Sequence, residues 1–281
     1  MPDTDSGASG SSRLRLGHIA YSNCFPVHAR LLDRPAPGDP ALREGTPAAL
    51  NRLLSEGSID IAPSSSIEYA LHPDTHRILP DLAIGSRGAV RSIVFLAERP
   101  IPELGGHTVA VPTASATSVV LLKILLRVRW DVDVRFRWFD QMSEDPFATG
   151  AAAALFIGDV ALRKDLHPLT PVRLDLGEEW WNETGLPFVF AVWQAASGSA
   201  AELRRLHQLL LESRTYGRDH RSALAKRYSR HFAMPAGALA AYWEGLVYDL
   251  DPAMIEGLKT FYQLAQEIGE LDRVPPLRWI E

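Results

Sequence analysis

The clearest pattern of hydrophobic and polar positions lies in the middle of the chain. The alternating residues Val109 and Val111 end at Pro112, which cannot donate a hydrogen bond inside a sheet. Six small or hydroxyl-bearing residues follow, and an apolar helical run then extends from Val119 to Leu126. This succession of apolar, hydroxyl-bearing and again apolar residues predicts a strand, a tight turn and the N-terminus of a helix.

Similar patterns recur along the rest of the chain. Thr46 and Pro47 form a helix start, because Thr caps a helix and Pro suits its first position. Residues 199–268 have the pattern of three or four helices broken at Pro235 and Pro252. Strands are expected at 13–20, 59–62, 92–96, 132–139, 151–157, 172–176 and 188–193.

Alternation of strands and helices predicts an α/β protein with mostly parallel sheets. Two segments, near 94–99 and 188–193, are placed to cross between two halves of the chain. We therefore expect two lobes with a ligand cleft between them. The first comprises residues 13–95 together with 192–281, the second comprises 96–191, and residues 1–12 form a disordered N-terminus.

Composition excludes several classes of protein. The chain has 281 residues, 46% of them hydrophobic and 22% charged, which is typical of a globular protein. A net charge of −5 gives no basic footprint for nucleic acid. The single cysteine, Cys24, rules out an intrachain disulfide. We see neither a signal peptide nor an apolar run of the ~20 residues that span a bilayer, so we expect a cytoplasmic protein without membrane contact.

The turn after Pro112 is the first candidate binding site. Its side chains and backbone N–H groups come from Thr113, Ser115, Ala116, Thr117 and Ser118, more than one helix cap requires. Together with the helix dipole they would make a neutral cradle for an anion. A carboxylate fits better than a polyphosphate, because no P-loop lysine or Gly-x-Gly-x-x-Gly accompanies the turn. A helix with surplus capping residues is an equally good interpretation.

Polar residues also follow three other predicted strands. Ser22 and Asn23 follow the first strand, where Asn23 is either a ligand-binding amide or a turn residue. Ser65 and Ser66 form a second junction of strand, hydroxyls and helix. Asp159 follows the strand at 151–157, and a helix cap is the favoured alternative to a binding role.

A glycine-rich loop follows the apolar segment at 78–84. Gly85 and Gly88 bracket Ser86 and Arg87, which allows the backbone to approach a small ligand closely. Arg87 could bind a carboxylate through two hydrogen bonds, although most single loop arginines are simply solvated. Ser86, Arg87 and Gly88 are therefore candidate site residues.

The sequence lacks the motifs of several other kinds of catalytic or metal site. The histidines form no His-Glu-x-x-His pair, and one cysteine cannot build a thiolate metal site. No Gly-x-Ser-x-Gly elbow marks a serine hydrolase. The candidate residues can bind a small anion but supply no obvious strong base. We expect no metal and no cofactor.

Several motifs of the chain resemble those of a known family. The match extends from about Leu14 to Trp193 and rests on several motifs together: Tyr21-Ser22-Asn23, Ser65-Ser66-Ile67-Glu68-Tyr69-Ala70, Gly85-Ser86, Gly88-x-Val90-x-Ser92, Thr113-x-Ser115-x-Thr117-Ser118, Ile157-Gly158-Asp159 and Thr184-Gly185-Leu186-Pro187. These motifs are similar to those of chorismate dehydratase from the futalosine route to menaquinone. The resemblance implies a type II periplasmic-binding-protein-like fold with its site between the lobes.

The resemblance also implies a reaction, the loss of water from chorismate to give the enolpyruvyl ether of a hydroxybenzoate. On this hypothesis Asn23 and Ser86 are the catalytic residues. Asn23 orients the departing hydroxyl or the enolpyruvyl group, and Ser86 holds one charged end of the substrate. Ser115, Thr117 and Ser118 hold a carboxylate, and the substrate's own enolpyruvyl carboxylate acts as the base.

Three alternatives stay open. A solute-binding protein without catalysis shares the fold, but it is normally exported. The related dihydroxynaphthoate synthase of the same pathway is expected to carry a histidine in its second lobe, where this chain has Gly158 and Asp159. A ligand-sensing regulatory domain is the third, but no DNA-binding region is attached. The oligomeric state cannot be predicted.

Overall fold

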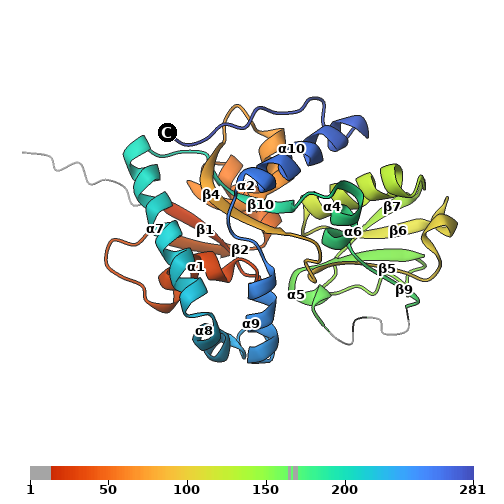
Figure 1. The fold of residues 1–281 in the computed structure, drawn as a ribbon, viewed down its shortest axis with the longest axis horizontal. Helices are drawn as coiled ribbons and strands as arrows, with labels where there is room; N and C mark the ends of the chain where they lie inside the picture. The colour runs from red at the N-terminus through yellow and green to blue at the C-terminus, as the bar shows by residue number, and fades with distance from the viewer. Residues whose placement is uncertain (1–13, 164–165, 167–169) are drawn as a thin grey trace, which may run out of the picture.

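The computed structural model describes residues 14–163, 166 and 170–281. Two five-stranded sheets lie side by side, each with helices packed against it (Figure 1). The first sheet has the strand order β2 (Ala41–Gly45), β1 (Arg15–Ile19), β3 (Ile61–Ser65), β10 (Phe188–Ala195) and β4 (Arg77–Ser86). The second has the order β7 (Arg135–Phe139), β6 (Thr108–Pro112), β8 (Ala153–Ile157), β5 (Ile93–Ala97) and β9 (Val172–Asp175).

Each sheet contains one strand that runs against the other four. β10 is antiparallel to β3 and β4, and β5 is antiparallel to β8 and β9. The two sheets are therefore mixed: four strands of each share one direction, as predicted, and the reversed strand is the feature that the sequence pattern did not predict. The reason lies in chain direction: β5 enters its sheet directly after β4 of the other sheet, so it starts at the edge where the remaining strands end. β10 enters the first sheet from that same edge.

Helices flank both sheets (Figure 1). Those of the first 185 residues are α1 (Phe25–Asp33), α2 (Pro47–Ser55), α3 (Ser66–Leu71), α4 (Ala116–Ile124), α5 (Gly158–Ala161) and α6 (Leu176–Thr184). Four more follow β10, as the sequence predicts: α7 (Ala200–Asp219), α8 (Arg221–Tyr228), α9 (Ala236–Gly245) and α10 (Pro252–Glu267). The predicted start of α2 is also confirmed, because the Thr46 side chain accepts a hydrogen bond from the N–H of Ala49.

The boundaries of the predicted lobes lie close to where the chain passes between the two sheets. The predicted boundaries at 95/96 and 191/192 fall inside β5 and β10, the two strands that begin at the shared edge. The later helices approach the first sheet, since α7 packs on α1 and α10 contacts β10. The division into residue ranges stays a prediction. The expected disorder of residues 1–12 lies outside the described residues.

Buried aromatic rings join the helices to the crossing strand. Trp180 of α6 and Phe261 of α10 both pack edge-on against Phe188, at 5.1 and 5.0 Å between ring centroids. All three side chains are nearly inaccessible to solvent. The first residue of β10 is therefore closely packed between α6 and α10. Within the described part of the chain, no helix is long and apolar enough to cross a membrane.

Candidate functional site

The edge where the parallel strands end carries a cleft. Residues that follow or end β1, β3, β4, β6 and β8 line it, together with residues of β5, β10, the start of α2 and the end of α9: Ile19, Tyr21, Asn23, Pro47, Ser65, Ile84, Val90, Ser92, Ile93, Ser115, Ser118, Ile157, Gly158, Phe190, Ala191 and Leu246. About 550 Å³ of empty space, partly open to solvent, lies between them. The carboxyl ends of strands are where α/β proteins bind ligands. We call this space the cleft.

Asn23 is the most informative residue of the cleft. Its Oδ1 atom is buried and has no hydrogen-bond partner among the described residues. Such an atom requires an explanation, because leaving it unpaired costs free energy. Its backbone is not left-handed, which removes one reason for an Asn at this turn. The backbone carbonyl of Asn23 accepts a hydrogen bond from the Tyr248 hydroxyl at 3.0 Å, which fixes the backbone of the turn and leaves the side-chain amide for a ligand.

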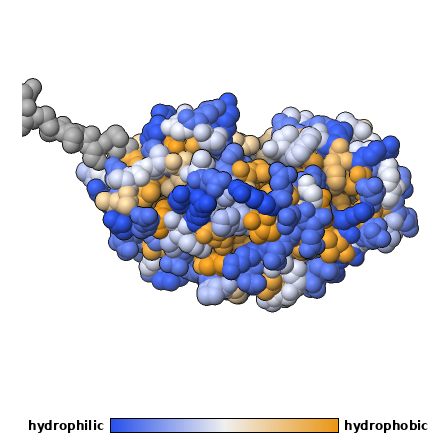
Figure 2. Space-filling view, turned by 90° about the horizontal axis from the view of Figure 1, so that it is seen from above, coloured by the Kyte–Doolittle hydropathy of each residue, from blue (hydrophilic) through white to orange (hydrophobic). Residues whose placement is uncertain are grey.

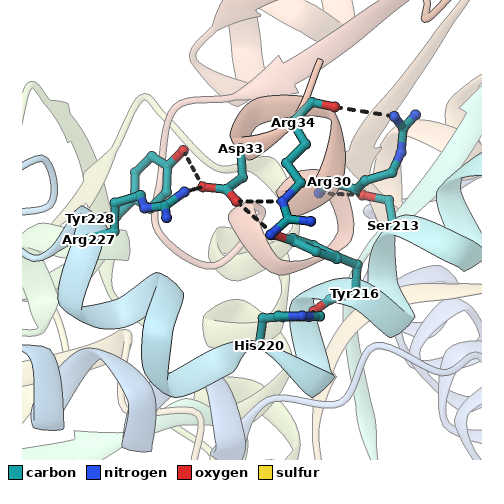
Figure 3. Close-up of polar contacts among 8 residues, drawn as sticks. All are labelled: Arg30, Asp33, Arg34, Ser213, Tyr216, His220, Arg227 and Tyr228. Atoms are coloured by element: carbon teal, nitrogen blue, oxygen red, sulfur yellow. Dashed lines mark hydrogen bonds and ion pairs between the residues drawn. The ribbon is translucent and has the colours of Figure 1, made fainter. Parts of the chain in front are cut away.

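Helix α1, which begins just after Asn23, is fixed at its far end (Figure 3). The carboxylate of Asp33 accepts hydrogen bonds from the guanidinium of Arg227 and from the hydroxyl of Tyr216, the latter at 2.7 Å. Its side chain is 2% exposed. The backbone N–H of Arg30 donates to the Ser213 hydroxyl at 3.0 Å. These contacts tie α1, which directly follows the turn with Asn23, to α7 and α8.

Ser22 and Asp159 join the two sides of the cleft. The Ser22 hydroxyl donates to the carboxylate of Asp159, and the Ser22 N–H lies 3.2 and 3.3 Å from its two oxygens. Burial raises the pKa of the Asp159 carboxyl, and the hydrogen bonds from Ser22 oppose that rise. Asp159 does not cap α5, which excludes the favoured structural interpretation. The two sides are in contact here, so the cleft is closed at this point.

The turn before α4 uses its hydroxyls in three ways. Ser115 caps the helix by accepting from the N–H of Ser118 at 3.4 Å, and its own hydroxyl donates to that of Ser118 at 3.0 Å. Both side chains line the cleft. The hydroxyl of Thr117 instead accepts from the N–H of Ile67 in α3, at 3.1 Å. Thr113 and Ala116 are exposed and do not line the cleft.

The second junction, before α3, lies opposite the first. Ser65 lines the cleft, whereas the Ser66 hydroxyl donates to the Val189 carbonyl at 2.8 Å. The hydroxyl oxygens of Ser66 and Thr117 are 3.3 Å apart, so the two junctions are in direct contact. This places the N-termini of α3 and α4 beside each other.

The glycine-rich loop is arranged differently from the cradle. The buried hydroxyl of Ser86 donates to the Gly88 carbonyl at 2.8 Å, and neither residue lines the cleft. Gly88 has a φ of +88°, which glycine adopts without strain. Arg87 forms an ion pair with Asp251 at the start of α10, and its side chain is 43% exposed. It lines a separate cavity with Tyr248 and Asp249.

The structure thus brings Asn23, Ser65, Ser115 and Ser118 together in the cleft, and it joins Ser22 to Asp159 beside them. Sequence reasoning missed Tyr21, Ser92 and Phe190. Tyr21 packs on Gly158, where a Cβ would lie 3.1 Å from the ring. Ser92 belongs to the motif Gly88-x-Val90-x-Ser92, but nothing in the sequence indicates that this residue lines the cleft.

Three buried residues have the spacing of metal ligands. The ligand atoms of His18, Cys24 and His28 lie within 4.8 Å of one another. However, the indole N–H of Trp193 donates to Nε2 of His28 at 3.1 Å, which places the proton of that neutral imidazole on Nδ1. That N–H faces Nδ1 of His18 at 2.9 Å. Burial also raises the pKa of the Cys24 thiol to about 12. The arrangement fits a neutral hydrogen-bond chain better than a metal centre.

Comparison with known proteins yields a family and several relatives. A family model described as menaquinone biosynthesis matches residues 14–267. The chain is 31% identical over 261 residues to the chorismate dehydratase of Thermus thermophilus, a match that covers 88% of this chain and 93% of that protein. It is 30% identical over 180 residues to the chorismate dehydratase of Campylobacter jejuni, covering 62% of this chain and 64% of that protein.

Solved structures show the same fold at lower identity. A protein of Archaeoglobus fulgidus superposes with a TM-score of 0.77 at 18% identity, over 93% of this chain and 100% of that one. The periplasmic aliphatic sulphonate binding protein SsuA of Escherichia coli superposes with a TM-score of 0.64 at 15% identity, over 94% and 89%. The second likeness places the chain among periplasmic-binding-protein folds, as the sequence motifs imply.

Proposed function

The chain belongs to the menaquinone biosynthesis family and has the chorismate dehydratase function of its curated relatives, and we propose that the reaction takes place in the cleft. The observation that carries the proposal is the buried, unpartnered Oδ1 of Asn23 among the hydroxyls of Ser65, Ser115 and Ser118. A neutral, hydrogen-bonding cleft of this kind suits a small dicarboxylate.

The chemistry tolerates a site without a strong base. The proton that leaves chorismate is allylic and vinylogous to the ring carboxylate. When its C–H bond breaks, the electron pair is delocalised toward that carboxylate. The neighbouring C–O bond then breaks, hydroxide departs with a proton as water, and the ring becomes aromatic. The protein has to position the substrate and stabilise the delocalised charge.

The hydroxyls before α4 bind one carboxylate in this proposal. Ser115 and Ser118 face the cleft, and the backbone N–H groups of Ala116 and Thr117 belong to the same turn. Ser65, just before α3, lines the opposite wall of the cleft, and Ser66 contacts Thr117 behind it. Both helix N-termini favour negative charge at this point.

Asn23 orients the departing hydroxyl or the enolpyruvyl group. Its amide offers two donors and an acceptor, and the acceptor is unpaired among the described residues. Ser86 does not line the cleft and acts instead as a positioning residue. Its hydroxyl holds the Gly88 carbonyl, which fixes the loop that leads to Val90 and Ser92 of the cleft wall.

We propose the substrate's enolpyruvyl carboxylate as the base. No histidine or lysine lines the cleft in the described part of the chain, and Asp159 is held outside it by Ser22. Closure of the two sides through this Ser22–Asp159 contact excludes water from the reacting ring.

A solute-binding protein and the related synthase are the alternatives. The synthase would need a histidine at the cleft, where the structure has Gly158 and Asp159. His167, which belongs to the second half, lies outside the described residues. A solute-binding protein would bind chorismate without converting it. We further propose that the protein acts in the cytoplasm.

Chorismate turnover by variants tests the proposal. Replacing Asn23 and Ser86 together by alanine should lower kcat/KM by about 100-fold or more, as loss of preorganised donors does in other enzymes. Lys259→Gln, on the exposed side of α10, is the matched control and should retain wild-type turnover. A double variant as active as the control would contradict the proposed site.

A further inference from the structure

A second, larger cavity lies outside the Ser22–Asp159 contact. It is lined from both sides, by Tyr21 and Tyr242 on one side and by Arg91, Asp159 and Arg163 on the other. About 1600 Å³ of space, open to solvent, lies within it, compared with about 550 Å³ in the cleft. Tyr21 lines both spaces, so the cavity adjoins the cleft directly. We call it the outer cavity.

Arg91 lies in the segment that joins β4 to β5, between the two sheets. Its neighbour Ser92 lines the cleft and accepts a hydrogen bond from Tyr242, whereas Arg91 itself lines the outer cavity. Consecutive residues of the crossing segment therefore face the two spaces. A group bound by Arg91 would be one residue away from the cleft wall.

The backbone of Arg91 is unusual. Its φ is +67°, in the left-handed region that favours glycine and that other residues rarely adopt. The carboxylate of Asp175 holds this conformation by accepting hydrogen bonds from the N–H groups of both Val90 and Arg91. Such backbone strain persists where the surrounding structure enforces it, and it is concentrated at functional sites.

The guanidinium of Arg91 is exposed and forms no ion pair with any residue that the structure describes. The carboxylate of Asp159, the acidic group on the described lining, already accepts its hydrogen bonds from Ser22. With Arg163 also on it, the lining that the structure describes carries two guanidinium groups and one carboxylate. Its polar character differs from that of the neutral cleft.

We propose that the outer cavity is a binding site for the dicarboxylate substrate, in which Arg91 binds a carboxylate before the substrate enters the cleft. This assignment rests on the proposed function. A planar guanidinium binds a carboxylate through two parallel hydrogen bonds, and a cationic entrance raises the association rate of an anion. Arg91 is thus a specificity-determining residue for a doubly charged substrate.

Two substitutions separate charge from backbone strain. Arg91→Gln removes the charge, and Arg91→Gly removes the charge while relieving the left-handed backbone. Both should raise KM for chorismate about tenfold, the scale of one charge-assisted hydrogen-bonded pair, with kcat within twofold of wild type. Arg91→Gly should also unfold at a temperature no lower than wild type. Increasing salt should lower kcat/KM more steeply in wild type than in Arg91→Gln.

Asp131→Gly is the matched control. Asp131 is another exposed residue with positive φ, at +49°, and it does not line either space. It should retain the wild-type KM. Unchanged KM and salt dependence in both Arg91 variants would overturn the assignment and leave the dehydratase function intact.

Failure of the proposed function would be recognised separately. If the wild-type protein binds chorismate without converting it, the same comparison is made by calorimetry on Kd. A Kd about tenfold weaker in Arg91→Gln than in Asp131→Gly then supports the outer binding site. Equal Kd values overturn it.

Discussion

The carboxylate of Asp159 accepts hydrogen bonds from both the backbone N–H and the hydroxyl of Ser22, across the boundary between the two sheets. Asp159 begins the short helix α5, and Ser22 precedes Asn23 in the turn before α1. The same contact therefore closes the cleft beside Asn23.

Figure 2 shows hydrophilic side chains over most of one face, with hydrophobic ones in scattered patches.

Asp159→Asn should weaken closure without abolishing chemistry. The amide provides one acceptor oxygen, and its NH₂ group would meet a Ser22 donor, so about one charge-assisted hydrogen bond is lost. We expect KM for chorismate to rise about tenfold while kcat changes less than about threefold. Steady-state kinetics measures KM and kcat, and calorimetry measures the Kd for chorismate. Abolished turnover with intact chorismate affinity would instead identify Asp159 as the base and exclude substrate assistance.

Asp60 should stabilise the first sheet in a pH-dependent way. Hydrogen bonds from Arg15 lower the pKa of its carboxyl from 3.8 to about 2. The stabilisation is thus present above the ordinary pKa and is lost as pH falls from 4 through 2. After allowance for solvent screening we expect Asp60→Asn to lower the unfolding free energy at pH 7 by about 1–2 kcal/mol.

Urea unfolding of wild type and Asp60→Asn at pH 7, 4 and 2.5 tests this expectation. The difference between the two proteins should narrow at the lowest pH. The exposed Asp272→Asn serves as the control. A difference that is independent of pH would mean that the hydrogen bonds, rather than the charge of Asp60, account for the stabilisation.

The buried histidine pair should make the protein sensitive to mild acid. Burial, and secondarily the charge of His231, lower the pKa of His18 from 6.5 to about 4, and burial likewise lowers that of His28. Between these values the unfolded chain binds a proton that the folded protein does not. Stability therefore falls as pH drops from 6.5 toward 4, by about 1.4 kcal/mol per pH unit for each such histidine.

His18→Gln keeps an acceptor for the N–H of His28 but removes one titrating group. The slope of unfolding free energy against pH should decrease by about 1.4 kcal/mol per unit between pH 6 and 5. Denaturant unfolding at several pH values measures the slope. An unchanged slope would show that His18 is charged in the folded protein.

Gly217 lets α7 approach α1. A Cβ at this position would lie 2.2 Å from the carbonyl oxygen of Pro26, a contact that forces the helices apart. We expect Gly217→Ala to destabilise the protein by about 1–3 kcal/mol and to lower kcat, because Asn23 precedes α1. Gly237→Ala in α9 meets nothing within 4 Å and should instead stabilise by about 0.5–1 kcal/mol. Equal effects of the two substitutions would contradict the close-packing argument.

The junctions of strand, hydroxyls and helix could be predicted from sequence because their signals are local. Ser115 does cap α4, and Ser65 does lie at the edge of the cleft, where a strand ends. The short strand β2 and the helix α1 escaped prediction. β2 is largely exposed and shows no clear alternation, and α1 is stabilised by distant contacts such as those of Asp33.

Side-chain partners distant in sequence could not be predicted. Arg87 pairs with Asp251, 164 residues later, and no local pattern links them. The hydroxyl of Ser86 is directed to the Gly88 carbonyl by the three-dimensional course of the loop. The reversed directions of β5 and β10 follow from how the chain crosses between the two sheets, which strand and helix periodicity does not encode.

Incubation of the purified wild-type protein with chorismate, without metal or nucleotide, tests the central claim most directly. Products are separated by chromatography and weighed by mass spectrometry. We predict a product lighter than chorismate by one water, formed at a rate that depends on enzyme concentration and strongly reduced in Asn23→Ala. Chorismate recovered intact, whether bound or free, would contradict the account.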